Sequence, residues 1–344
     1  MKYQIAKKIE SNQELDFASE LESLETTSFD AGSLFHKSPS GQILTGYQKT
    51  SIYCPKINPN YHFHGALEDI CLLFTENPDP LYVFGPTGSG KTSLLKQVAA
   101  RLNYPVFDVT GHSRLEFPDM VGHLTVKDGT MLYQYGPLAL AVKYGGLFLL
   151  NEIDLLDPAT CAGLNGILDG EPLCVLENQG EMILPSPNFR FAATANSNGA
   201  ADQTGLYQGI LRQNLAFMDR FRLREVGYPS QDAEREILAK ASPQLPEVIR
   251  NAMISVAREI RELFMATTSS SLADQNEGVE ITFSTRTILR WADLCHRLRF
   301  RHRNVGQVII SALDQALGWR ATPQTRQLLH ETARKYFPKH FTQS

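Results

Sequence analysis

The segment "LYVFGPTGSGKTS", residues 81–93, constrains the fold of this chain more than any other stretch. A short apolar run leads into a glycine-rich turn, and the turn opens the amphipathic stretch "KTSLLKQVAARLN" at residues 91–103. This strand–turn–helix order is the setting that the phosphate-loop pattern G-x-x-x-x-G-K-[ST] requires. Glycines let backbone N–H groups surround phosphate oxygens, and the helix N-terminus adds the positive end of its dipole. The sequence therefore predicts a nucleotide site on an α/β scaffold.

The predicted site takes its phosphate contacts from this loop. Lys91 would reach the β- and γ-phosphates of ATP, and the Thr92 hydroxyl would bind Mg²⁺. The residues expected to bind the nucleotide are Gly85, Pro86, Thr87, Gly88, Ser89, Gly90, Lys91, Thr92 and Ser93.

The stretch "GGLFLLNEID", residues 145–154, predicts a buried strand that ends in Asn151 and Glu152. Nucleotide-hydrolysing enzymes often carry Asp-Glu here, where the Asp helps to hold Mg²⁺ and the Glu activates water. Glu152 is suited to accept the proton of the attacking water. Asn151 can accept a hydrogen bond from a magnesium-bound water, but a neutral acceptor bonds more weakly than a charged one. We expect hydrolysis with weakened Mg²⁺ binding, and a nucleotide-gated scaffold that barely hydrolyses stays open as an alternative.

Three further polar residues are candidates for the same site. Asn196 ends the apolar stretch "FAATAN" and is suited to orient the attacking water or the γ-phosphate. Arg220 lies in "FMDRFRL" and Arg286 in "STRTILRW". Arginines are mostly exposed surface residues, so these two carry little weight by themselves.

Short apolar strands alternate with amphipathic helices in the middle of the chain. We expect strands at residues 81–85, 104–109, 146–153 and 189–196, and helices at 91–103, 137–145 and 157–168. Because the strands are continuously apolar, they predict a parallel sheet with helices on both faces. Two hairpins are predicted at residues 123–136 and 172–185, with turns at Asp128-Gly129 and Asn178–Gly180.

Strand patterns end at "GYPS", residues 227–230, and only helical stretches with one polar loop, "SSSLADQNEG" at 269–278, follow. We therefore divide the chain into a partly ordered N-terminal arm (1–60), an α/β nucleotide-binding domain (61–226) and a helical lid domain (227–344). The arm is either weakly ordered or a docking segment for a partner. Phe17, Leu21 and Leu24 fall at helical spacing within it.

Composition limits the classes of function. The formal net charge of −4 argues against general adhesion to nucleic acid, although a local basic patch stays open. The five cysteines are scattered and never in C-x-x-C spacing, so neither a disulfide framework nor structural zinc is expected. The first residues lack the apolar core of a secretory signal, and Lys143 interrupts the best apolar run. We expect a cytoplasmic protein without a membrane segment.

With these motifs in order, the chain resembles an AAA+ ATPase of the branch that contains MoxR-like proteins, magnesium chelatase and dynein-related ATPases. Within this branch it is most similar to the CobS family, the ATPase subunit of aerobic cobaltochelatase. The likeness covers residues 50–300. The segments that carry it are "INPNYHF", "GPTGSGKT", "QVAARLNYP", "FAATAN", "GLYQG", "LAFMDRF" and "FSTRTILRWA".

The resemblance implies a P-loop AAA+ core that binds ATP and Mg²⁺. Lys91 and Thr92 match the Walker A lysine and threonine, Glu152 matches the Walker B base, and Asn196 matches sensor 1. Asn151 departs from the family's Asp, which puts the affinity for Mg²⁺ in doubt.

The resemblance also implies how subunits cooperate. Arg220 matches the arginine finger, which reaches the γ-phosphate of the neighbouring subunit, and Arg286 matches sensor 2 in the helical lid. The two hairpins fall where this branch has inserts that face a central pore. Such ATPases work as rings, usually hexamers, and often act on a partner with a metal-dependent von Willebrand A domain.

Alternatives remain within and outside this family. The partner activity is either cobalt insertion, as in the chelatase itself, or general remodelling of a protein. A nucleic-acid motor of the restriction or translocase type is the other class. Its support is an arginine cluster made of Arg290, Arg297, Arg299, Arg301 and Arg303.

Overall fold

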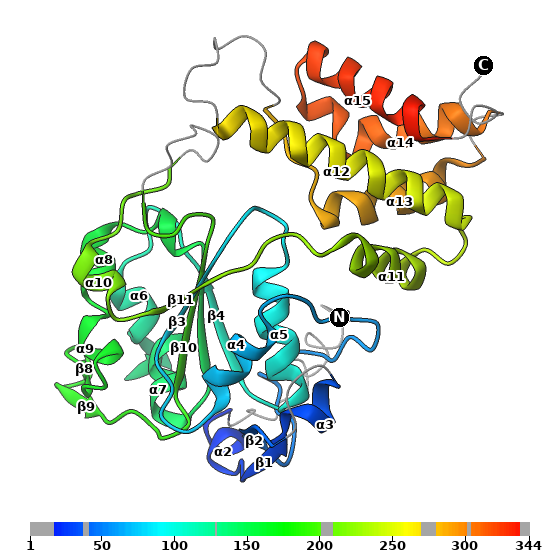
Figure 1. Cartoon of the computed structure of the whole chain (residues 1–344). Coiled ribbons are helices and arrows are strands. Elements are labelled where there is room, and N and C mark those ends of the chain that lie inside the picture. Colours follow the sequence, from blue (N-terminus) through cyan, green and yellow to red (C-terminus); the bar gives the residue numbers. More distant parts are fainter. Residues whose placement is uncertain are drawn as a thin grey trace.

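A five-stranded parallel sheet organises the α/β part of the chain (Figure 1). The computed structural model describes residues 17–36, 41–127, 129–200, 209–269, 280–300 and 304–337. The strands lie in the order β11 (Arg222–Glu225), β3 (Leu81–Phe84), β10 (Arg190–Ala195), β7 (Leu147–Asn151) and β4 (Val106–Thr110). In a parallel sheet all carboxyl ends share one edge, so the residues that follow β3, β7 and β10 come together there. The predicted fold class is confirmed.

Alternate residues of the strands enter two separate apolar clusters, one on each face of the sheet. On β7, Phe148 and Leu150 belong to one cluster, whereas Leu147 and Leu149 belong to the other. All of β7 is buried, as a central strand covered on both faces should be. The first cluster includes helices α6 (Phe117–Val121) and α7 (Pro137–Tyr144), and the second includes α4 (Leu67–Cys71), η1 (Leu72–Phe74) and α5 (Lys91–Arg101).

Both predicted hairpins are present. The first pairs β5 (Gly122–Lys127) with β6 (Thr130–Tyr135), and the second pairs β8 (Leu173–Val175) with β9 (Glu181–Ile183). Asp128 of the first turn lies outside the described residues.

The single helix expected over residues 157–168 is wrong, because the chain forms two short helices, α8 (Pro158–Ala162) and α9 (Asn165–Leu168). Asp157 caps α8, since its carboxylate accepts the Ala159 N–H at 2.8 Å. The break lies at Gly163, where an added Cβ would come within 2.9 Å of the Phe117 ring. Gly163 thus packs closely against a ring that is distant in the sequence, a contact that no local pattern reveals.

The segment expected to be a partly ordered arm (1–60) contains regular structure in its described part. Its described elements are α2 (Phe17–Glu22), β1 (Thr26–Asp30), α3 (Ala31–Phe35) and β2 (Ile43–Tyr47), with β1 and β2 antiparallel. Leu44 is 0% exposed and Tyr47 is 2% exposed, and both belong to the apolar cluster that contains α5. Phe17 and Leu21, two of the residues at helical spacing, lie in α2. No continuous apolar run in the sequence indicates β1 or β2. Residues 1–16 lie outside the described part of the chain.

A helical bundle follows β11 and lies at the end of the α/β body opposite the N-terminal hairpin (Figure 1). Its helices are α11 (Gln231–Ala241), α12 (Glu247–Ser269), α13 (Thr285–Leu298), α14 (Val305–Ala316) and α15 (Pro323–Tyr336). The bundle has its own apolar core, in which the fully buried Trp291 donates its indole N–H to the Ile309 carbonyl at 3.0 Å. The predicted polar loop after Ser269 lies outside the described residues. None of the helices that these residues form has the length and apolar character that crossing a bilayer demands.

Candidate nucleotide-hydrolysis site

The loop between β3 and α5 has the backbone of a phosphate cradle. Gly88 and Gly90 have φ angles of +76° and +96°. This left-handed conformation is unfavourable for residues that have a Cβ, and glycine adopts it readily. Gly90 caps α5, so the helix N-terminus points its free N–H groups at this loop. The predicted loop therefore has a backbone shape and a helix N-terminus that suit a phosphate.

Lys91 is held inside the loop by three acceptors. Its ammonium group donates to the carbonyls of Gly85 at 2.7 Å and Pro86 at 3.1 Å, and to the side-chain oxygen of Asn196 at 3.1 Å. Burial lowers the pKa of Lys91 to about 8, although the negative charges of Asp154 and Glu152 oppose the shift. The lysine is thus directed into the site, and its lowered pKa means that it loses its charge at a lower pH than an exposed lysine does.

Thr92 and Asn151 meet at the end of β7. The Thr92 hydroxyl donates to the Asn151 side-chain oxygen at 2.7 Å, and the Thr194 hydroxyl lies 3.3 Å from the same oxygen. Asn151 is 7% exposed. The carboxamide oxygen is therefore fixed beside the hydroxyl by two hydrogen bonds.

Glu152 leaves the strand in an unusual conformation. Its φ angle is +55°, which is uncommon for a residue other than glycine, and its side chain is exposed. Its backbone N–H lies 3.4 Å from the Thr194 hydroxyl. The left-handed turn separates Glu152 from Asn151, so the two polar side chains serve different positions of the site.

The backbone of Asn196 is held by Asp154, a residue that no sequence pattern indicates. Asp154 is fully buried in η2 (Ile153–Leu155), and its carboxylate accepts the N–H groups of Asn196 at 2.7 Å and Ser197 at 3.2 Å. Burial raises the pKa of Asp154, and these two N–H donors oppose the rise. Asp154 thus fixes the end of β10 against the turn after β7.

Two neighbouring cavities lie at this edge of the sheet. The smaller has a volume of about 100 Å³, and the predicted site residues that line it are Thr87, Gly88, Gly90, Lys91, Thr92, Ser93, Asn151, Glu152, Asn196 and Arg286. The larger has a volume of about 670 Å³ and extends past Ser89 to Tyr61 and His64, with Ile237 and Leu289 of the bundle on its far side. Arg286 lines both cavities. The polar pocket suits phosphates, and the larger cleft beside it has room for a nucleoside.

Arg220 stands apart from both cavities. It follows α10 (Leu215–Met218), and its guanidinium donates to both carboxylate oxygens of Asp169 at 2.8 to 3.0 Å. It also donates to the Ala216 carbonyl at 2.6 Å. The structure therefore does not bring Arg220 to the site of its own chain.

The donor set fits a magnesium ion held jointly with a nucleotide. The described residues contain no group of three or more His, Cys, Asp or Glu side chains that could hold a metal by themselves. Thr92 and Asn151 supply one hydroxyl and one amide oxygen, both hard ligands. Mg²⁺ is commonly held by one or two protein oxygens together with substrate phosphates and water.

Comparison with known proteins agrees with this geometry. Residues 80–213 match the AAA domain of the dynein-related subfamily, and residues 234–336 match the CbbQ/NirQ/NorQ C-terminal domain. The aerobic cobaltochelatase subunit CobS from Sinorhizobium sp is 30% identical over 260 residues, which are 73% of this chain and 75% of that protein.

Two further relatives match a shorter part of this chain. Protein NorQ from Paracoccus denitrificans is 30% identical over 64% of this chain and 75% of its own length. The denitrification regulatory protein NirQ from Stutzerimonas stutzeri is 30% identical over 60% of this chain and 72% of its own length. The chain therefore belongs to the AAA+ ATPases of the dynein-related, MoxR-like type, in the group that includes CobS, NorQ and NirQ.

Proposed function

We propose that this chain forms a ring, as in related ATPases a hexamer, that couples hydrolysis of MgATP to the remodelling of a partner protein. In this proposal the phosphate loop and Lys91 bind the phosphates, and Glu152 takes the proton of the attacking water. Asn196 orients that water, and Arg286 contacts the γ-phosphate from the lid. Their joint lining of one small cavity supports these roles.

The position of Arg220 carries the ring proposal. A cation beside the transferring phosphoryl group stabilises the charge of the transition state. Arg220 is paired with Asp169 and lines neither cavity of its own subunit, which supports a role at the site of a neighbouring subunit. The pair with Asp169 is partly exposed, so water screens it and a phosphate of the neighbouring site would compete for the guanidinium.

Mg²⁺ would be held by the Thr92 hydroxyl and, through a water molecule, by Asn151. The ion would neutralise charge on the β- and γ-phosphates. Because Asn151 is uncharged, this chain contributes less to binding the ion than a carboxylate would.

A protein partner is supported by the two hairpins. They present large apolar side chains to solvent, which in a monomer are candidate contact sites for another protein. The most exposed are Val126, Met131, Leu176 and Leu184. The partner would carry a von Willebrand A domain or be a metal chelatase.

Mixing two inactive variants tests the proposed ring. Glu152→Gln removes the base and Arg220→Ala removes the cation, and each should lower turnover by about a hundredfold or more. In a ring with head-to-tail contacts, an equal mixture should recover about a quarter of the wild-type rate, since a quarter of the sites combine Glu152 of one subunit with Arg220 of its neighbour.

The control is Glu152→Gln mixed with the double variant Glu152→Gln/Arg220→Ala, which has no intact base and should stay inactive. A mixture of the two single variants that stays inactive at all protein concentrations would exclude action between subunits.

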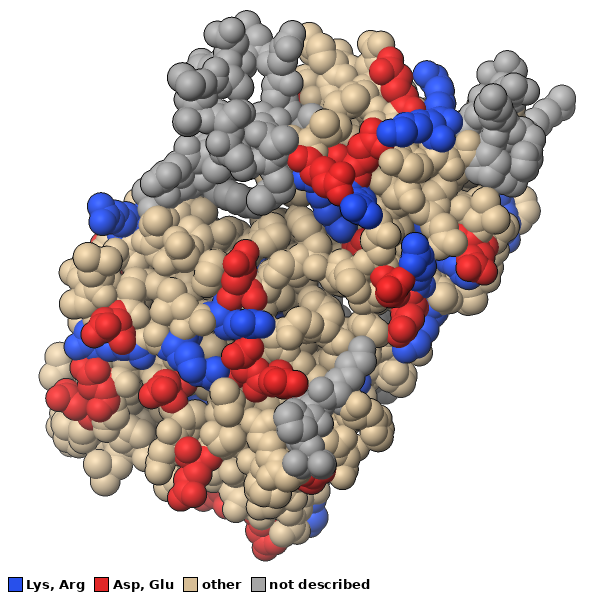
Figure 2. Space-filling view, in the orientation of Figure 1, with Lys and Arg blue, Asp and Glu red and all other residues tan. Residues whose placement is uncertain are grey.

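A nucleic-acid motor remains the second candidate, and its support is weaker. Within the arginine cluster, Arg297 pairs with Asp293 at 2.8 Å and Arg299 contacts His296, while Arg301 and Arg303 lie outside the described residues. On the face drawn in Figure 2, Lys and Arg are interspersed with Asp and Glu. Salt-sensitive stimulation of ATP turnover by DNA would favour this second candidate.

A further inference from the structure

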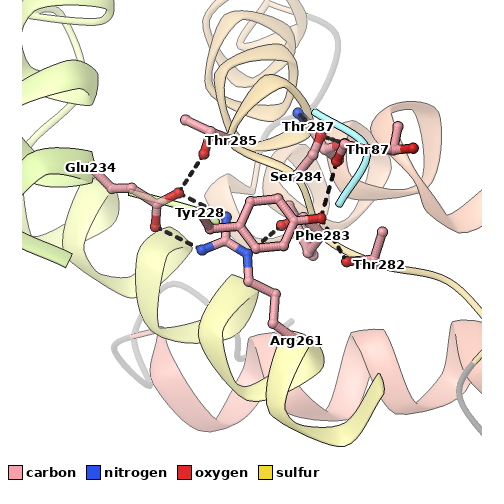
Figure 3. A network of polar contacts seen from close by, with 9 residues as sticks. All are labelled: Thr87, Tyr228, Glu234, Arg261, Thr282, Phe283, Ser284, Thr285 and Thr287. Carbon is pink, nitrogen blue, oxygen red and sulfur yellow. Dashed lines mark hydrogen bonds and ion pairs between the residues drawn. The ribbon is translucent and has the colours of Figure 1, made fainter. Parts of the chain in front are cut away.

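A polar network joins the phosphate loop to the helical bundle (Figure 3). We propose that Tyr228, Arg261 and Glu234 are positioning residues that tie the start of α13, and with it Arg286, to the backbone of the phosphate loop. The inference rests on the proposed role of Arg286 and adds the residues that hold this arginine in place.

Tyr228 makes the contact with the phosphate loop. It lies between β11 and α11, and its hydroxyl donates to the Thr87 carbonyl at 3.1 Å. The same hydroxyl lies 3.0 Å from the hydroxyl of Thr282, in the segment that leads into α13. One side chain therefore touches both the loop and the approach to the lid helix.

Arg261 connects Tyr228 to three elements of the bundle. Its guanidinium carbon lies 4.2 Å from the centre of the Tyr228 ring, a cation–π contact. It donates to both oxygens of Glu234 at 2.7 and 3.0 Å, and its Nε donates to the Phe283 carbonyl at 2.6 Å. The planar fork of an arginine permits this arrangement in few orientations, so α11, α12 and the residues before α13 are fixed together.

Glu234 completes the connection to Arg286. Its side chain is 2% exposed, and it accepts the Thr285 hydroxyl at 2.8 Å in addition to Arg261. Thr285 is the first residue of α13, and Arg286 is the second. The same Glu234 oxygen accepts both Thr285 and Arg261. A shift at the start of α13 would therefore disturb the buried Glu234–Arg261 ion pair.

The phosphate loop also contacts the start of α13 directly. Ser284 caps α13 by accepting the Thr287 N–H at 3.1 Å. A Cβ added to Gly88 would lie 2.4 Å from the Ser284 Cβ, so this glycine packs against the cap. Because the peptide bond is planar, the bond from Tyr228 to the Thr87 carbonyl also sets the orientation of Gly88. A change at the phosphates would therefore move Arg286, and a movement of the lid would reach the loop.

A double-mutant cycle on ATP turnover of the full-length chain tests this coupling. Tyr228→Phe removes the hydroxyl but keeps the ring beneath Arg261, which avoids leaving a buried charge unpaired. It should lower kcat by about three- to tenfold, the equivalent of one hydrogen bond, with the melting temperature little changed. In an Arg286→Ala background the same substitution should have no further effect, because the arginine that it positions is gone.

Tyr47→Phe is the matched control. It removes a hydroxyl that donates to the Gly145 carbonyl at 3.1 Å, a bond of the same kind and length in another part of the α/β body. This variant should turn over ATP at the wild-type rate.

The outcomes separate the inference from the proposed function. The inference is overturned if Tyr228→Phe keeps the wild-type kcat while Arg286→Ala loses activity, or if the two losses multiply in the double variant. A wild-type rate for Arg286→Ala alone would instead remove the proposed role of the lid arginine, and the inference with it.

Discussion

Asn151 occupies the position from which a carboxylate would normally support a magnesium ion. Its side-chain oxygen accepts the Thr92 hydroxyl at 2.7 Å and is nearly buried at the end of β7. A carboxylate there would make the same contacts with a negative charge, and charge-assisted hydrogen bonds are about twice as strong as neutral ones. In the proposed site the amide would therefore keep these contacts and contribute less than a carboxylate to binding the ion.

Asn151→Asp should therefore lower the Mg²⁺ concentration needed for half-maximal turnover by about five- to tenfold, the equivalent of one strengthened hydrogen bond. The measurement is ATP turnover at fixed ATP across a Mg²⁺ titration. Asn304→Asp is the control, because Asn304 caps α14 in the bundle and Asp caps helices equally well. An unchanged Mg²⁺ requirement in Asn151→Asp would show that Asn151 takes no part in holding the ion.

From the lowered pKa of Lys91 we expect nucleotide affinity to depend on pH. Burial lowers its pKa to about 8, so the free protein loses the ammonium charge as the pH rises through that value. A bound triphosphate favours the charged form and raises the pKa, so binding takes up a proton above about pH 8. Affinity should fall as the pH increases, by at most about tenfold per pH unit.

Binding of a fluorescent ATP analogue between about pH 7 and pH 9.5 checks this prediction, since that range spans the lowered pKa. Lys91→Arg keeps its charge throughout this range and should show a flatter profile, whatever its absolute affinity. Equal slopes in the two proteins would assign the pH dependence to another group.

At the scale of elements, the sequence predicts best what is continuous along the chain. The strands β3, β7 and β10 are uninterrupted apolar runs, and α5 opens directly from a glycine-rich turn, so local patterns indicate each of them. β11 was not predicted because Arg222 and Arg224 alternate with an exposed Leu223 in a strand at the edge of the sheet. Such a strand is defined by its backbone pairing with β3.

The same distinction applies to the site. Lys91, Thr92 and Asn196 could be identified because each ends a recognisable motif, and the structure brings them to one cavity. Asp154 and Thr194 could not, because their importance arises from bonds between strands that are neighbours only in space. No spacing in the sequence connects Tyr228 with Thr87 or Glu234 with Thr285 either. Sequence motifs therefore identify the residues at their own ends, and they do not identify residues that hold those side chains in place.

At the scale of the whole molecule, the N-terminal hairpin forms part of the α/β core. Leu44 is 0% exposed, whereas its neighbour Ile43 is 56% exposed. Leu44→Ala should lower the free energy of unfolding by about 2–5 kcal/mol, because it leaves a cavity in a packed core. Ile43→Ala should change it by less than about 0.5 kcal/mol. Denaturant unfolding of the two variants makes the comparison, and equal effects would show that the hairpin is peripheral.

The N-terminal hairpin also limits where a recombinant fragment of this ATPase can begin. The Tyr47 N–H donates to the Leu102 carbonyl at 2.9 Å, and its ring lies 5.2 Å from that of Tyr104, so β2 covers the C-terminal end of α5. A recombinant fragment that begins at residue 61 would expose this apolar surface to water. Expression boundaries chosen from the phosphate loop and its flanking motifs alone would therefore yield a fragment prone to aggregate.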